Sequence, residues 1–262
     1  MLPHHDVRIT ALLLVLAAAS VSLGLAQSGD PDASTVELTL AYWSVHTNGT
    51  IRASGTPVDF RSDLGVDQNT PTFAGKLDIR PGRRHWLRIE GAPIRLDGNR
   101  NLSRSITYQG RTYSLNDTVT STASLDYFYA GYQFDVISRP AGHFGLQAGG
   151  AYLNATGAIV SQTTSIGAAK SQTVGLPLAG VGFRAFPIHG ILDLTIAGDL
   201  KGMHFGKYGN FVQADASVGV GKGHFFVEGG YRFMKADIHD SPGLNQAAPT
   251  FRGPVISLRF KL

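Results

Sequence analysis

The sequence predicts an all-β fold: one antiparallel up-and-down barrel that crosses a membrane with about ten strands, or with eight as an alternative. Apolar and polar residues alternate along ten segments, as in the closing GPVISLRFKL. The connections between these segments alternate between short and long. Only 16% of the residues are charged, where about 25% is usual for a soluble protein. A membrane offers such a chain an apolar surrounding.

Each extended segment is about long enough to cross a bilayer as a tilted strand, for which about 9 to 11 residues suffice. The segments are 35–47, 72–80, 85–97, 118–138, 143–156, 174–187, 191–203, 210–221, 224–237 and 251–262. Short connections with PGRR, RPAGH, FPIHG and GKGH join alternate pairs, and the others are 48–71, 98–117, 157–173, 204–209 and 238–250. Tight turns at one end and long loops at the other are typical of outer-membrane barrels.

Alternation separates a polar face from an apolar face, and the polar face is nearly neutral. Its acids are Glu37, Asp78, Glu90, Asp135, Asp193, Asp199, Asp215 and Glu228, and its bases are Lys76, Arg80, Arg88, Arg184, Lys201, Arg232 and Arg259. An enclosed lumen favours such balance, because an unpaired buried charge is costly. We therefore predict that these side chains form a charge network inside the barrel.

The apolar face carries aromatic residues near several strand ends, as the two membrane interfaces require. We expect these belts to face lipid: Tyr42, Phe134, Phe144, Tyr152, Phe225, Tyr231 and Phe260. The alternative is a soluble, lipocalin-like barrel, in which the same alternation would point the apolar face inward. Periodicity alone does not separate the two.

The N-terminal segment predicts export. Residues 1–26 have one Arg before an apolar stretch, followed by Gly24 and Ala26 with the spacing of a cleavage site, which indicates a signal peptide. A short segment, 27–34, then leads to the barrel domain, 35–262. The chain has no Cys, which excludes a lipoprotein anchor, disulfides and thiolate metal sites.

The ending FRGPVISLRFKL resembles the closing strand of small bacterial outer-membrane barrels of the OmpA, OmpX and OmpW-like families, with alternating hydrophobics up to Phe260. It departs from them in ending on Leu262, where an aromatic residue is usual, and those families have eight strands. The resemblance implies the bacterial outer membrane and insertion by the outer-membrane assembly machinery. Because ten strands are an even number, we expect both termini on the periplasmic side. It also implies contact with outer-membrane lipids and lipopolysaccharide.

Two rim sites could carry envelope enzyme chemistry. Asp237 and His239 resemble the Asp/His pair of omptin-like proteases, with Asp97 as the nearest second acid, and a His with an Asp partner can activate water. In the alternating pattern of this strand, however, both residues fall on the face expected to contact lipid. His239 and Ser241 have the spacing of lipid A deacylases, although Pro242 and Gly243 follow at once. We expect no enzyme activity.

Two further motifs have structural explanations. GVGKGH, 219–224, resembles a phosphate-binding loop, but a strand follows it directly, so it predicts a turn. His85, His143, His189 and His224 lie near the four short turns, too far apart around a barrel for one metal ion; interfacial placement is the expectation. We predict no metal and no cofactor.

The favoured function is non-enzymatic: a barrel with a plugged or narrow lumen that acts structurally or through its extracellular loops. Fifteen inward charges, Trp43, Trp86, Tyr127 and Tyr129 would fill much of a ten-stranded lumen. The loop 98–117 is expected to extend its strands as a hairpin. A narrow porin or a transporter of small or hydrophobic solutes is the alternative. Scattered basic residues argue against nucleic-acid binding, and we expect a monomer.

Overall fold

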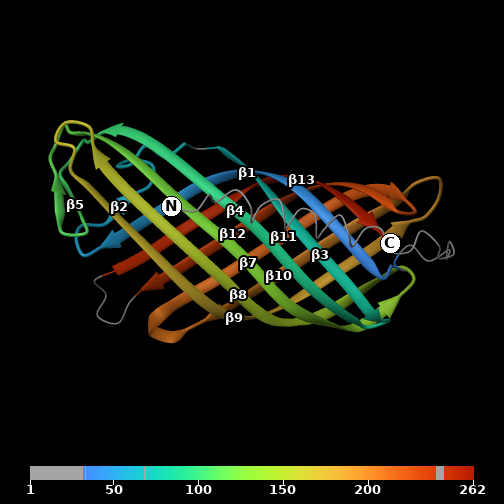
Figure 1. Ribbon diagram of the computed structural model, residues 1–262. Coiled ribbons are helices and arrows are strands. Elements are labelled where there is room, and N and C mark those ends of the chain that lie inside the picture. Colours follow the sequence, from blue (N-terminus) through green and yellow to red (C-terminus); the bar gives the residue numbers. More distant parts are fainter. Residues whose placement is uncertain (1–31, 33, 68, 240–244) are drawn as a thin grey trace, which may run out of the picture.

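The chain forms a closed ten-stranded antiparallel barrel, so the eight-stranded alternative is excluded (Figure 1). The computed structural model describes residues 32, 34–67, 69–239 and 245–262. The barrel strands are β1 (Val36–Ala53), β3 (Thr70–Gly82), β4 (His85–Asn101), β7 (Thr118–Arg139), β8 (Gly142–Ser161), β9 (Gly167–Ile188), β10 (Asp193–His204), β11 (Gly209–Lys222), β12 (Phe225–His239) and β13 (Asn245–Lys261). Pairing of β13 with β1 closes the barrel.

In the part of the barrel that carries the apolar band, closure gives every strand a partner on both sides, which a bilayer demands because no water is present there to bond free N–H and C=O groups. The described part of the chain contains no helix that is long and apolar enough to cross a membrane. The expected signal peptide, 1–26, lies outside the described residues, and the proposed division into 27–34 and 35–262 stays a prediction.

The two ends of the barrel differ. At the turn end, residues 83–84, 140–141, 189–192 and 223–224 connect neighbouring strands, and β1 begins and β13 ends there. The GVGKGH motif contains the predicted turn, but only at 223–224, because β11 runs to Lys222 and β12 starts at Phe225. At the loop end lie 54–67, 102–117, 162–166 and the 3-10 helix η1 (Gly206–Tyr208). The expected long loop 157–173 is wrong: β8 and β9 pair through most of it and turn at 162–166.

An apolar band surrounds the turn-end part of the barrel. On β8 the outward side chains from Phe144 to Tyr152 are apolar, a span of nine residues that fits the length of a membrane strand. Beyond Tyr152 the outward residues are Asn154 and Thr156, so the band ends there. The structure places the predicted aromatic residues outside, each at least 37% exposed: Tyr42, Phe134, Phe144, Tyr152, Phe225, Tyr231 and Phe260.

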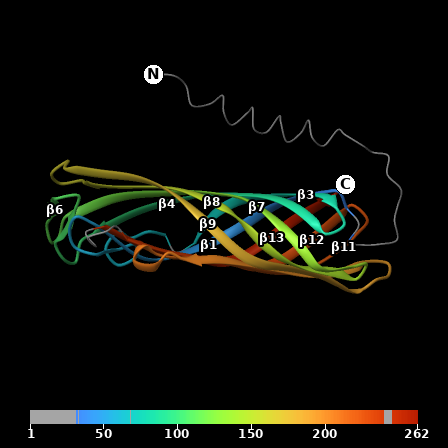
Figure 2. The same cartoon turned by 90° about the horizontal axis from the view of Figure 1, so that it is seen from below.

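On one side the barrel wall continues well past the apolar band. Strands β4, β7, β8 and β9 form this extension, visible as the elongated loop end in Figure 2. Its outer face is polar: Arg95 pairs with Asp126 at 2.5 Å, and Thr173 donates a hydrogen bond to Asn154. Its inner face is apolar, as the buried Ile94, Leu96, Leu153 and Ile159 show. Strands with one wet and one dry face persist outside a bilayer only if something covers the dry face.

A folded cap, defined here as residues 54–67 and 102–117, covers this inner face. It contains β2 (Val58–Asp59) and the hairpin of β5 (Ile106–Tyr108) and β6 (Arg111–Tyr113). Gln109 and Gly110 form the turn with φ of 52° and 70°, which suits a tight hairpin. The expected hairpin exists, but it is a separate sheet rather than a prolongation of the barrel strands. Its apolar side chains fold inward, and the Tyr113 hydroxyl donates to the carbonyl of Ile159 at 3.0 Å.

Candidate functional site: the barrel interior

The interior of the turn-end half is a charge network whose members come from neighbouring strands by alternation. In the β3–β4 register Asp78 lies opposite Arg88, and Lys76 opposite Glu90. The Arg88 guanidinium donates to Asp78 at 2.6 Å, and the Lys76 ammonium lies 3.4 Å from the same carboxylate. Strict two-residue periodicity therefore produces ion pairs along one wall.

Other bonds cross the lumen. The Lys201 ammonium on β10 donates to Glu90 on β4 at 2.6 Å, and Arg88 on β4 reaches Asp199 on β10 at 2.5 Å. Strands β7, β8 and β9 separate β4 from β10 in the barrel. Gln213 on β11 also donates to Glu90. The side chains from opposite walls thus meet in the middle and obstruct the passage.

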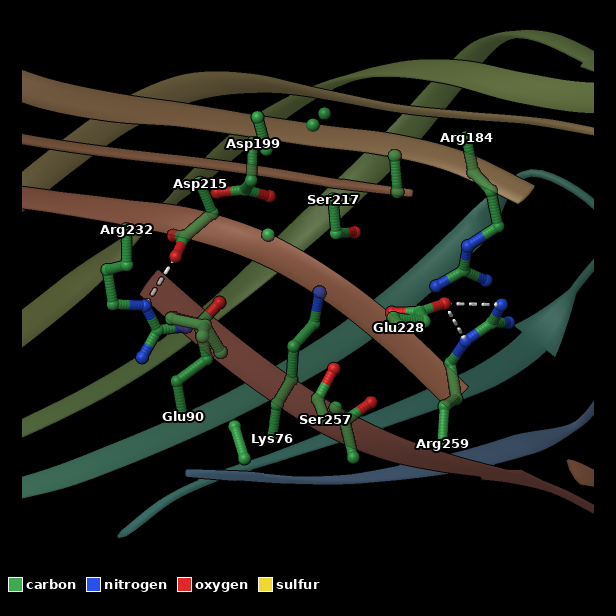
Figure 3. Close-up of a pocket in the computed structure, with 18 of the residues that line it drawn as sticks. Lys76, Glu90, Arg184, Asp199, Asp215, Ser217, Glu228, Arg232, Ser257 and Arg259 are labelled. Carbon is green, nitrogen blue, oxygen red and sulfur yellow. Dashed lines mark hydrogen bonds and ion pairs between the residues drawn. The ribbon is translucent and has the colours of Figure 1, made fainter. Parts of the chain in front are cut away.

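A second layer lies closer to the turn end. Glu37 on β1 accepts a hydrogen bond from Arg184 on β9 at 2.7 Å, again across the lumen, and lies 3.5 Å from Arg259. Arg259 in turn pairs with Glu228 at 2.7 Å. Figure 3 shows Arg184, Glu228 and Arg259 approaching one another from different strands, with the Arg259–Glu228 and Arg232–Asp215 pairs as dashed lines.

The remaining predicted charges also have partners. Asp135 accepts a hydrogen bond from Trp86 at 2.7 Å, and Asp193 lies 3.3 Å from Lys222. Arg80 lies 3.6 Å from Asp32. The full predicted set is thereby engaged within the protein: Glu37, Lys76, Asp78, Arg80, Arg88, Glu90, Asp135, Arg184, Asp193, Asp199, Lys201, Asp215, Glu228, Arg232 and Arg259.

Sequence reasoning missed several members of this network. Lys261 is buried inside the barrel, and its position two residues after Arg259 could have shown it. Gln133 and Gln147 bridge Asp135 and Asp199 through their side-chain amides, and their polarity at inward positions was the available signal. A cavity of about 110 Å³ remains among these polar groups, large enough for water.

An aromatic layer separates the network from the loop-end half. Trp43, Tyr127, Tyr129 and Phe211 are all buried there. The rings of Tyr127 and Phe211 stack at 6.1 Å, and the Lys201 ammonium lies 4.2 Å from the centre of the Tyr129 ring. The Tyr129 hydroxyl occupies the space over Gly131, where a Cβ would lie 2.1 Å from it. The lumen narrows at this layer because large rings pack against a glycine wall.

Above the aromatic layer the interior is apolar, which corrects the expectation of a polar inward face along the whole strand. On β4 the inward residues after Arg88 and Glu90 are Ala92, Ile94 and Leu96. Two adjoining cavities of about 90 and 110 Å³ lie here, and we call them together the chamber. Residues that line both are Ile51, Leu125, Ala155, Lys170, Gln172, Ala247, Pro249 and Phe251. The sequence could have shown that these residues point inward, because they occupy the same alternate strand positions as the inward charges.

The candidate rim protease site is not assembled. His239 lies 3.4 Å from Asp237, but both follow the outward parity of Tyr231 on β12. Asp97 faces outward on β4, and β1, β3 and β13 separate β4 from β12. Outward side chains on distant strands of a barrel diverge, so these groups cannot share one substrate. Ser241 of the second candidate lies outside the described residues.

The four histidines near the turns have separate environments. His143 is buried, with Nδ1 3.0 Å from Asp32, which makes the expected interfacial position wrong for this residue. It turns inward because its parity on β8 is that of Gln147. His85 contacts Tyr132 on the outer face. Within the part of the chain that is described, no three His, Cys, Asp or Glu side chains gather as a metal site.

A closed ten-stranded barrel with an apolar outer band and a polar lumen has the architecture of a transmembrane barrel of the bacterial outer-membrane type. No family model and no curated protein sequence matches this chain. Among solved structures, the chain is similar to the outer membrane protease OmpT from Escherichia coli, with 10% identity, a TM-score of 0.52, and 90% of this chain and 100% of that chain covered.

Two further matches have TM-scores below 0.5. The translocator domain of the autotransporter NalP from Neisseria meningitidis matches with 12% identity, a TM-score of 0.46 and 98% of each chain covered. The attachment invasion locus protein Ail of Yersinia pestis matches with 9% identity, a TM-score of 0.37, and coverage of 87% of this chain and 99% of that chain. The likeness to OmpT, at 10% identity, shows the fold alone.

Proposed function

We propose that this protein is a non-enzymatic outer-membrane barrel with a closed lumen, which acts as a structural and interaction protein through its loop end. The carrying observation is the set of bonds across the lumen, above all Lys201–Glu90 and Arg88–Asp199. A water-filled pore has charged side chains along its wall, whereas here side chains from opposite walls bind each other. The aromatic layer and the cap add two further obstructions.

The loop end is proposed to face the cell exterior and the turn end the periplasm. Short turns on one side and longer connections on the other support this orientation. On the outer face above Tyr42 and Phe233, the neighbouring strands β1, β13 and β12 carry His46, Arg252 and Lys235. Cations at this height suit the phosphates of lipopolysaccharide. Insertion by the outer-membrane machinery and a monomeric state remain part of the proposal.

The folded cap supports an interaction role. Arg104 donates to Asp63 at 2.6 Å and so joins the two loops of the cap, while Leu102 and Ile106 are fully buried beneath them. Burial raises the pKa of Asp63, but the Arg104 hydrogen bonds and charge outweigh this and hold the pKa below its ordinary value. An ordered surface beyond the membrane loses little entropy when a partner binds it.

Single-channel recording in a planar bilayer tests the closed lumen. The refolded wild-type barrel is expected to show no steady conductance. Replacing Arg88, Glu90 and Lys201 together by Ala should raise the frequency of open events. The matched control replaces the outer-face pair Arg95 and Asp126 by Ala and should stay silent. Steady, large conductance of the wild type would overturn the proposal and favour the narrow porin.

Location has its own test. The protein is expected to fractionate with outer membranes and to migrate faster on gels before heating than after, because a closed barrel resists unfolding by detergent. Recovery of folded protein from the soluble periplasm would contradict the outer-membrane assignment.

A further inference from the structure

The chamber in the loop-end half combines two properties that a packed core does not need. It is apolar, with Ile51, Leu125 and Phe251 in its wall. It is also open: Ala155 and Gln172 lie opposite each other in the β8–β9 register, point inward, and are nevertheless exposed. Burying apolar surface is favourable, and an accessible apolar cavity therefore attracts an apolar occupant.

Lys170 is the basic residue that lines both parts of the chamber. It points inward from β9. Its ammonium donates to the side-chain oxygen of Asn245, at the start of β13, at 2.8 Å. Strands β10, β11 and β12 separate β9 from β13, so this bond reaches across the mouth of the chamber.

Among the described residues, Lys170 has a polar partner in Asn245 but no ion pair. Over the ranges that the structure describes, no carboxylate lies within 4 Å of its ammonium. This contrasts with the turn-end network, where each predicted cation has an acid beside it. A half-buried cation beside an apolar cavity complements a molecule with an anionic head and an apolar chain.

We propose that the chamber binds a small anionic amphiphile, with its chain between Leu125 and Phe251 and its headgroup on Lys170. The two cavities of about 90 and 110 Å³ limit its size. An apolar cavity of about 150 Å³ holds one benzene molecule, so the chamber takes one single alkyl chain of medium length. Lipids with several long chains are too large.

This site goes beyond the proposed function, because binding in the chamber does not require a conducting lumen. The aromatic layer with Tyr127 and Phe211 forms its floor and separates it from the charge network. A failure of the conductance test would therefore leave the chamber intact, and absence of binding would leave the closed lumen intact.

Titration calorimetry with the full-length mature barrel in phosphatidylcholine nanodiscs tests the site, with empty nanodiscs as the blank. The probe is decanoate at pH 8, where it is anionic, compared with decyltrimethylammonium of the same chain length. Decanoate should bind saturably with one molecule per barrel, and the cationic probe should give only the heat of the blank. Equal saturable binding of both probes would refute the role of Lys170.

Four variants locate the site. Lys170→Met should weaken decanoate binding at least tenfold, while Lys170→Arg keeps the cation and should retain most of it. Ala155→Trp fills the chamber and should abolish saturable binding. Asn154→Trp places the same ring on the outer face one residue away and should leave binding unchanged. Gel migration before heating shows that each variant is folded. Unchanged binding in Ala155→Trp, or decanoate heats no larger than the blank, would overturn the proposal.

Discussion

The ion pair between Lys201 and Glu90 offers the sharpest test of the interior. Lys201→Met keeps the length of the side chain and removes its charge. The Lys201 side chain is fully buried, and its ammonium lies 2.6 Å from Glu90 and 3.2 Å from Asp199. Removal leaves two buried carboxylates short of one cation. Breaking a buried pair in this way costs about 3 to 5 kcal/mol of unfolding free energy.

The companion variants separate the pair from its surroundings. Glu90→Gln should cost less than Lys201→Met, because Lys201 keeps Asp199 and the new amide can still accept its hydrogen bond. In the double variant Asp199 retains Arg88 at 2.5 Å, so the loss should be smaller than the sum of the single losses. For side chains in one network the coupling is expected within about 0.5 to 3 kcal/mol.

Urea unfolding of barrels refolded into lipid vesicles measures these differences. The control is Arg95→Met on the outer face, where Arg95 and Asp126 are both nearly half exposed; such a surface pair contributes about 0 to 1 kcal/mol. If Lys201→Met costs no more than this control, the lumen is hydrated and the bonds across it do not hold the walls together.

Three further outcomes are expected. Ala148→Arg, outward at mid-band, should lower the unfolding free energy by about 2 to 4 kcal/mol, whereas Ala158→Arg above the band on the same strand should cost far less; equal losses would misplace the membrane. Because the folded pKa of Asp63 lies below its ordinary 3.8, the Arg104–Asp63 contact stabilises the cap above that pH and is lost as the pH falls through the folded pKa. Proteolysis of the cap should accelerate there in the wild type but not further in Asp63→Asn, and a pH-independent wild type would contradict this. Tyr113→Phe removes the bond to Ile159 and should destabilise the cap by about 1 kcal/mol, measured by hydrogen exchange of β5 and β6; unchanged exchange would show that this bond is dispensable.

The strand pattern and the two faces of the barrel were determined by the sequence alone. Side chains alternate with a period of two in any strand, so each charge placed with Arg88 and Glu90 had to share their face. The even strand number and the low charge then favoured a membrane barrel. These are local properties, and a pattern over ten residues suffices to show them.

The pairing of inward charges was decided only by the tertiary structure. Asp78 and Arg88 lie opposite each other on adjacent strands, so the hairpin register relates them. The ion pair between Lys201 and Glu90 depends instead on strand tilt and on the diameter of the closed barrel. The contact of His143 with Asp32 has the same origin: strand parity turns His143 inward, but only the closed barrel brings Asp32 next to it. Contacts across a lumen join residues about a hundred positions apart, and no local period encodes them.

The division of the interior into a polar half and an apolar half also needed the fold. The alternation along β4 shows that Ile94 and Leu96 share the face of the inward charges. It does not show where along the strand the membrane ends. Outside the bilayer water reverses the preference: the outer face becomes polar, as at Asp126, and apolar side chains gather within. The chamber around Lys170 lies at the level where the barrel strands leave the apolar band and the cap covers their inner face.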